Sequence, residues 1–152
     1  GLGTLRESDE PLVNDLLDLL GATEVDMTLF FRHLCSINEP DVARVADAFY
    51  EGSEPDTSAW NRWLKCWWER VDGQPDRDGM RRANPKYVLR NWMAQLAIDA
   101  AEERGDFSVA EELHELLKRP YDEQPEHEAK WFQKRPEWAR HRVGCSMLSC
   151  SS

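Results

Sequence analysis

The chain has 152 residues, a formal net charge of -10 and 41% hydrophobic residues, with seven tryptophans. This composition excludes a chain that is disordered as a whole and predicts one soluble globular domain. The negative charge repels phosphate backbones and anionic lipid heads, so nucleic acid and membrane surfaces are not expected as partners. No run of about eighteen apolar residues and no secretory signal pattern occurs, which predicts a cytoplasmic protein.

The four cysteines lack the dense spacing of a secreted disulfide scaffold, which indicates a reducing compartment. Cys35 and Cys66 lie on or near apolar helix faces, and we expect both to be small core residues. Cys145 and Cys150 are flanked by small polar residues, and we expect both thiols to be exposed and reactive. The chain begins with Gly1 rather than methionine, so we interpret it as a piece of a longer polypeptide.

Three short helices are predicted in the first third of the chain, because apolar residues recur there at steps of three and four. Their expected spans are about 8–21, 23–37 and 38–52, with Ser8 or Asp9, Thr23, and Asn38 or Asp41 at the starts and Gly21 and Gly52 as stops.

A tryptophan-rich helix follows the loop at residues 51–58 and is expected to be capped by Asp56 or Thr57. Its apolar stripe consists of Trp60, Trp63, Leu64, Trp67 and Val71. Such a stripe is more often core than a binding platform, since each tryptophan buries a large area. Trp68 falls off the stripe and is therefore the residue expected to contact something outside the core.

The longest expected helix covers residues 84–101, with Asn84 as its cap, Pro85 at its first position and Gly105 as its stop. Its wide apolar face suggests a central helix around which the others pack. The preceding stretch, residues 72–83, is predicted to be a loop with one helical turn around Met80.

The last third is expected to hold one more helix and then irregular structure. Ser108 opens a capping box for a helix that Pro120 ends. No segment has the alternation of a half-buried strand, so we predict an all-α fold of about six or seven helices. The expected parts are a helical core at 1–118, a Pro-rich segment with short helical turns at 119–143, and a flexible tail at 144–152.

The sequence has no common catalytic motif, and we expect no catalytic, cofactor-binding or metal-binding residue in this chain. His141, Cys145 and Cys150 form a run that resembles part of a zinc site, but the fourth ligand is missing and the cysteine spacing is wide. A basic cluster around residues 77–90 is more typical of a solvated face or a docking edge than of a phosphate site. Its members are Arg77, Arg81, Arg82, Lys86 and Arg90.

Several ordered motifs carry a resemblance to a known family. They are Thr-Leu-Phe-Phe-Arg at 28–32, Asn-Pro-Lys-Tyr-Val-Leu-Arg-Asn at 84–91, Gly-Asp-Phe-Ser at 105–108, Arg-Pro-Tyr-Asp-Glu-Gln-Pro-Glu at 119–126, Pro-Glu-Trp-Ala at 136–139 and Ser-Cys-Ser-Ser at 149–152. Together they resemble the C-terminal third of the selenoprotein O family, SelO or YdiU. Cys150 stands where some eukaryotic members carry selenocysteine.

The resemblance implies a role within a larger enzyme. Members of that family have a protein-kinase-like core that binds ATP with Mg²⁺ or Mn²⁺ and transfers AMP to hydroxyl side chains of proteins, releasing pyrophosphate. The nucleotide, metal and base residues belong to the N-terminal core, and none maps onto this sequence. The resemblance therefore implies a bacterial cytoplasmic protein in which this chain is a structural and regulatory part, with the kinase-like core and protein substrates as partners.

The same resemblance turns the tail cysteines into redox candidates. A site that accepts cysteine or selenocysteine implies thiol exchange, so Cys150 is expected to form a reversible disulfide with Cys145 or with a cysteine of the kinase-like core. The alternative interpretation of the whole chain is a stand-alone helical protein-interaction module, with Trp68 and the basic cluster as its surface.

Overall fold

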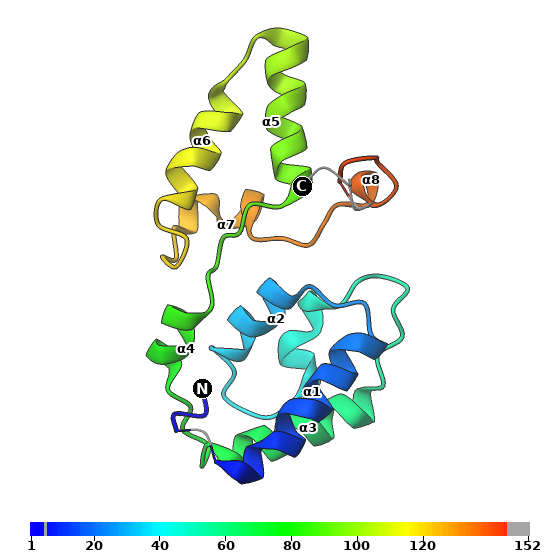
Figure 1. Cartoon of the computed structure of the whole chain (residues 1–152), viewed down its shortest axis with the longest axis vertical. Helices are drawn as coiled ribbons and strands as arrows, with labels where there is room; N and C mark the ends of the chain where they lie inside the picture. Colours follow the sequence, from blue (N-terminus) through cyan, green and yellow to red (C-terminus); the bar gives the residue numbers. More distant parts are fainter. Residues whose placement is uncertain (5, 146–152) are drawn as a thin grey trace. The chain divides into compact units, whose positions relative to one another are not determined.

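The computed structural model describes residues 1–4 and 6–145. The regular elements of these residues are all helices, which confirms the all-α prediction. Cys150 and most of the expected tail lie outside the described residues. The helices are η1 (Glu7–Asp9), α1 (Glu10–Ala22), α2 (Met27–Leu34), η2 (Val42–Ala48), α3 (Thr57–Arg70), α4 (Arg77–Ala83), α5 (Asn91–Arg104), α6 (Ser108–Leu117), α7 (Pro125–Trp131) and α8 (Glu137–Arg140), where η denotes a 3₁₀ helix (Figure 1).

The chain divides into two compact units, Gly1–Asn84 and Pro85–Ser152. This division differs from the expected single core at 1–118, because α5 and α6 group with the later segment rather than with the first helices. Each unit has its own set of buried apolar residues, and therefore its own core. The two units are called unit 1 and unit 2.

The core of unit 1 is built where α3 packs against α2 and η2. Trp60, Leu64 and Phe30 are completely buried, and the rings of Phe30 and Phe49 both lie 5.2 Å from that of Trp60. The expected tryptophan stripe on α3 is therefore core, as predicted. Aromatic pairs at this separation add to the large area that each ring buries.

Aspartates begin four helices of unit 1, because a side-chain carboxylate can accept a bond from a free N–H in the first turn. In each of the four helices the aspartate precedes the first helical residue. The pairs are Asp26 with Leu29 N, Asp41 with Ala43 N, Asp56 with Ala59 N and Asp76 with Gly79 N, all at 2.9 to 3.0 Å.

Three details of the predicted N-terminal half are wrong. Gly21 does not end the first helix, because α1 continues to Ala22. Thr23 does not cap the second helix; its hydroxyl oxygen accepts a bond from Trp60 Nε1 at 3.4 Å, and the helix starts later. The third element is the short 3₁₀ helix η2, which ends at Ala48. Three residues separate it from Gly52, so that glycine is not its stop.

The expected central helix at 84–101 is also wrong in its first half, since α5 begins only at Asn91. The N–H groups of Lys86 and Tyr87 both donate to Pro120 O, at 2.7 and 3.0 Å. These donors hold the segment extended against the loop that follows α6, and Asn84 and Pro85 start no helix. The predicted stop is confirmed, because Gly105 has φ 63° and closes α5 in the left-handed conformation.

The core of unit 2 forms where α5 and α6 run antiparallel (Figure 1) and α7 and α8 pack on them. Trp92 of α5 stacks on Trp131 of α7, with ring centroids 5.9 Å apart. Both short helices, α7 and α8, lie within the Pro-rich segment at 119–143. Ser108 is not the cap of α6; its N–H instead donates to Asp106 Oδ1 at 2.9 Å.

Candidate docking face on helix α1

Helix α1 differs from every other α-helix of the described residues because none of its thirteen side chains is buried. The α-helices from α2 to α8 each have at least one buried residue. Yet α1 carries six aliphatic residues. They are Leu12, Val13, Leu16, Leu17, Leu19 and Leu20.

Two specific contacts fix α1 on α3 despite this weak burial. Trp63 Nε1 donates to Leu12 O at 2.8 Å. Just before α1, the carboxylate of Asp9 accepts bonds from Arg70 Nη2 at 2.9 Å and from Arg6 N at 2.8 Å. The bond from Arg70, followed by that from Arg6, lowers the pKa of Asp9. The carboxylate is therefore charged at neutral pH and holds the start of α1 to the end of α3.

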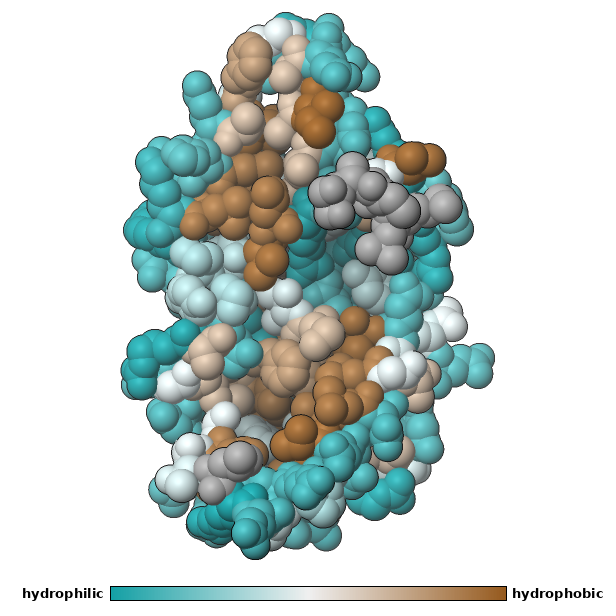
Figure 2. Space-filling model, in the orientation of Figure 1, coloured by the Kyte–Doolittle hydropathy of each residue, from teal (hydrophilic) through white to brown (hydrophobic). Residues whose placement is uncertain are grey.

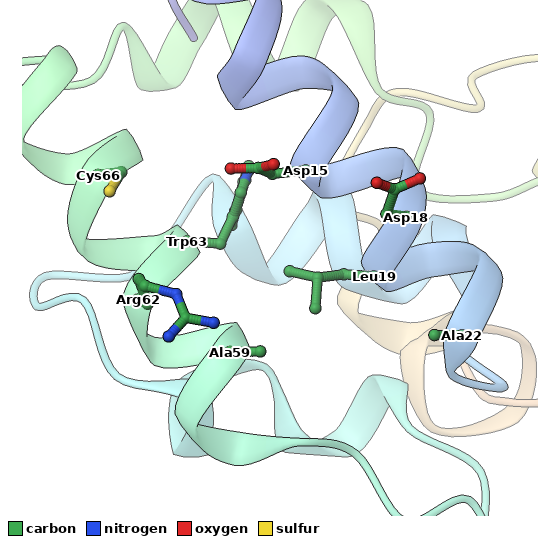
Figure 3. A pocket seen from close by; sticks show the side chains of 8 residues that line it. All are labelled: Asp15, Asp18, Leu19, Ala22, Ala59, Arg62, Trp63 and Cys66. Atoms are coloured by element: carbon green, nitrogen blue, oxygen red, sulfur yellow. The ribbon is translucent and has the colours of Figure 1, made fainter.

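A cleft of about 410 Å³ lies between α1 and α3. Figure 3 shows Asp15 and Asp18 on the α1 side and Arg62 and Cys66 on the α3 side. Leu19 and Trp63 are also among its lining residues. Within the described residues, Asp15, Asp18 and Arg62 form no ion pair. Three charges without a counterion can therefore meet groups from outside the chain.

A second hollow, about 270 Å³ in volume, lies where α1 approaches α2, α3 and α4, and apolar side chains line most of it. Its lining includes Leu12, Val13 and Leu16 of α1. The walls opposite α1 come from Phe31, Leu34, Trp63, Trp67 and Met80.

The outer side of α1 is apolar and acidic. Val13 is 40% exposed and Leu17 58% exposed, and Figure 2 shows hydrophobic surface where Figure 1 places this helix. The helix carries Glu10, Asp15 and Asp18 but no lysine or arginine. We name this surface the α1 face: Val13, Leu17, the two hollows and these three carboxylates.

The cysteines are placed differently from expectation. Cys35 is buried as predicted, and this burial raises the pKa of its thiol. Cys66 is exposed and Cys145 is buried, so both predictions are wrong. Cys66 borders the cleft between α1 and α3, and Cys145 packs into the core of unit 2 with Trp92 and other apolar residues. The redox role of Cys150 stays a prediction.

The basic cluster divides between internal contacts and surface. Arg77 donates to Cys35 O at 2.9 Å and to Ile37 O at 2.6 Å, which satisfies carbonyls after α2. Lys86 is buried in unit 2 and pairs with Glu123 and Glu128. The expected solvated face is therefore wrong for Arg77 and Lys86, whose side chains make contacts within their own units. Trp68 is half-buried, with its ring 5.9 Å from that of Trp67, and its outside contact stays a prediction.

The network around Lys86 was not foreseen from the sequence. Lys86 Nζ lies 2.8 Å from both Glu123 Oε2 and Glu128 Oε2, and Tyr87 Oη donates to Glu123 O at 2.8 Å. Burial lowers the pKa of Lys86, but the bonds to the two glutamates outweigh it and raise that pKa overall. The signal lay in the Lys-Tyr and Glu-Gln-Pro-Glu motifs, which the resemblance identified without a structural role.

In the part of the chain that the structure describes, no group of three or more His, Cys, Asp or Glu side chains could hold a metal ion. His141 is exposed while Cys145 is buried. No helix of residues 1–4 and 6–145 has the length and apolar character needed to cross a membrane.

Curated proteins similar in sequence to this chain are bacterial proteins named protein nucleotidyltransferase YdiU. Those from Flavobacterium johnsoniae and Azoarcus sp. are each 47% identical and match 100% of this chain, and that from Rhodopirellula baltica is 47% identical over 96% of it. The chain spans 31% of the length of each of these relatives. A family model described as "Protein adenylyltransferase SelO" matches residues 1–118. The chain belongs to the SelO family.

Proposed function

We propose that this chain is the C-terminal helical part of a SelO-type protein adenylyltransferase and that it supports catalysis without carrying out the chemistry. ATP with Mg²⁺ or Mn²⁺ binds the kinase-like part of the polypeptide, and AMP passes from there to a serine, threonine or tyrosine hydroxyl of a protein substrate. The role of this chain is to fold as a helical support and to present surfaces to that part.

One observation carries this proposal. The whole chain matches proteins named nucleotidyltransferases, yet it spans only 31% of their length. The resemblance implies that the family's nucleotide and metal residues belong to the part that this chain does not span. The described carboxylates form no group that fits a metal ion, and we therefore derive no catalytic step from them.

The test is AMP transfer from labelled ATP to a mixed protein acceptor in the presence of Mg²⁺ or Mn²⁺. We expect no label with the 152-residue chain alone. Label is expected with a chimera in which this chain replaces the matching segment of the F. johnsoniae relative. Stoichiometric transfer by the chain alone would overturn the proposed division of labour.

A second candidate function is a stand-alone helical interaction module, and the uncovered α1 face is the observation that favours it. In that case the chimera would be inactive while the chain alone would still bind a separate partner. The AMP-transfer assay therefore separates the two candidates.

A further inference from the structure

We infer that the α1 face binds another segment of the same polypeptide. This segment belongs to the two thirds of SelO-family proteins that this chain does not span. The expected segment carries aliphatic side chains flanked by lysine or arginine. This inference rests on the proposed function and names the surface through which the helical part meets the rest of the protein.

The first step is that α1 is structurally incomplete in this chain. Six aliphatic residues on thirteen positions are enough for a buried stripe, yet Leu12, Leu16, Leu19 and Leu20 are only half-buried, and Val13 and Leu17 are exposed. Single exposed apolar residues need no explanation. A whole helix that lacks a buried residue, flanked by hollows of about 410 and 270 Å³ in the same unit, does need one.

The second step concerns the size of the face. Thirteen residues make a helix about 20 Å long and about 10 Å wide, so the part of the face that α1 itself supplies is only about 200 Å² in projection. A stable complex between separate proteins buries about 800 Å² on each partner. A second copy of the chain or a free protein would therefore bind this face weakly.

A tethered segment avoids this limit. When two surfaces belong to one polypeptide, the effective concentration of one at the other reaches the millimolar range, and a small contact suffices. The relatives supply such a tether, since about two thirds of their length lies outside the match.

The third step is charge. Glu10, Asp15 and Asp18 give the face three negative charges, and the cleft holds one positive charge, Arg62 of α3, so the face stays negative overall. Asp15 and Asp18 border the cleft next to apolar Leu19. A covering segment gains most when its aliphatic residues fill the hollows and its lysine or arginine side chains reach these carboxylates.

The experiment is hydrogen–deuterium exchange of backbone amides in residues 10–22, measured in the chain alone and in the F. johnsoniae chimera. We expect exchange at least about tenfold slower in the chimera, because a covered helix opens less often. Leu17→Arg in the chimera should restore the fast exchange of the isolated chain, since it places a long cation against a basic segment.

The matched control is Ile98→Arg, which changes another aliphatic residue of similar exposure, 46%, on α5 of unit 2. It should leave exchange in residues 10–22 unchanged. Equal exchange of α1 in chain and chimera would overturn the inference. So would a concentration-dependent dimer of the isolated chain that Leu17→Arg abolishes, because the occupant would then be a second copy.

If the chimera does not melt cooperatively, the same comparison is made between the F. johnsoniae relative and its own excised matching segment, with the same two outcomes. Failure of the inference is distinguishable from failure of the proposed function. A chimera that transfers AMP while α1 exchanges as in the isolated chain refutes only the contact. Transfer by the chain alone refutes the function, whatever the exchange shows.

Discussion

Unit 1 and unit 2 complete their packing in different ways. In unit 2 all four α-helices, α5 to α8, bury at least one residue, and a paired lysine and a tyrosine hydroxyl tie the extended segment before α5 to the loop after α6. In unit 1 the core of α2, η2 and α3 is dense, but α1 lies over it with no buried side chain.

The number of aliphatic residues in a helix therefore does not predict how far other elements of the chain bury that helix. Helix α1 contains six aliphatic residues and buries none of them fully, whereas α7 has a single large apolar residue, Trp131, and buries it almost completely. A surface that stays open in this way is available for a contact outside the chain, and the four changes below test this difference.

The largest effect is expected for Trp60→Ala in the core of unit 1. Trp60 is completely buried against Phe30 and Phe49, and the change should lower the free energy of unfolding of unit 1 by about 3 to 5 kcal/mol. Urea denaturation followed by amide exchange in α3 measures it. A loss below about 1 kcal/mol would mean that the tryptophan core is not the main source of stability in unit 1.

Lys86→Met tests how much the ion pairs of Lys86 with Glu123 and Glu128 stabilise unit 2. The variant keeps the apolar stem but loses two charge-assisted bonds, and because Glu123 and Glu128 are half exposed we expect a loss of only about 1 kcal/mol. The Lys86 pKa is raised in the folded chain, so its stabilisation is complete below about pH 10.5 and disappears as pH rises through the folded pKa. The difference between wild type and variant should shrink accordingly in thermal melts at alkaline pH; a constant difference would contradict the assignment.

Asp9→Asn tests the attachment of α1 and should lower the Tm of unit 1 modestly. Since the pKa of Asp9 is lowered from 3.8, its contribution is complete above about pH 3.8 and is lost as pH falls through the folded pKa. Melts of wild type and variant should therefore converge in acid. Identical melts at pH 7 would show that the pair with Arg70 does not hold α1.

The smallest effect is expected for Leu17→Ser in the chain alone. Leu17 is 58% exposed, so the free energy of unfolding should change by less than about 0.5 kcal/mol. Urea denaturation measures this change. A loss above about 2 kcal/mol would mean that the residue is buried in solution.

Most helices could be predicted from the sequence, because their apolar periods and several of their signals are local. The aspartate before the tryptophan-rich helix and Gly105 after α5 act within one turn of the chain. The failure at residues 84–90 has a physical cause. Pro85 permits a helix start, but the N–H groups of Lys86 and Tyr87 donate instead to Pro120 O. This acceptor lies more than thirty positions further along the chain, so no local pattern indicates it.

The α1 face could not be predicted for a related reason. Periodicity indicates which side of a helix is apolar, but not whether a neighbour covers it. The same limit explains Cys66 and Cys145, whose exposure depends on packing beyond their own segments. The ion pair of Asp9 with Arg70 joins residues sixty-one positions apart, and no local pattern indicates it.

The most direct test of an open α1 is amide exchange in the 152-residue chain alone, with α1 and α3 compared in one experiment. If the α1 face is uncovered, amides of α1 should exchange at least about tenfold faster than those of α3, through a local opening that leaves the tryptophan core intact. Exchange of both helices at one rate, through one common unfolding of unit 1, would show that α1 is an integral part of the core and would contradict the account.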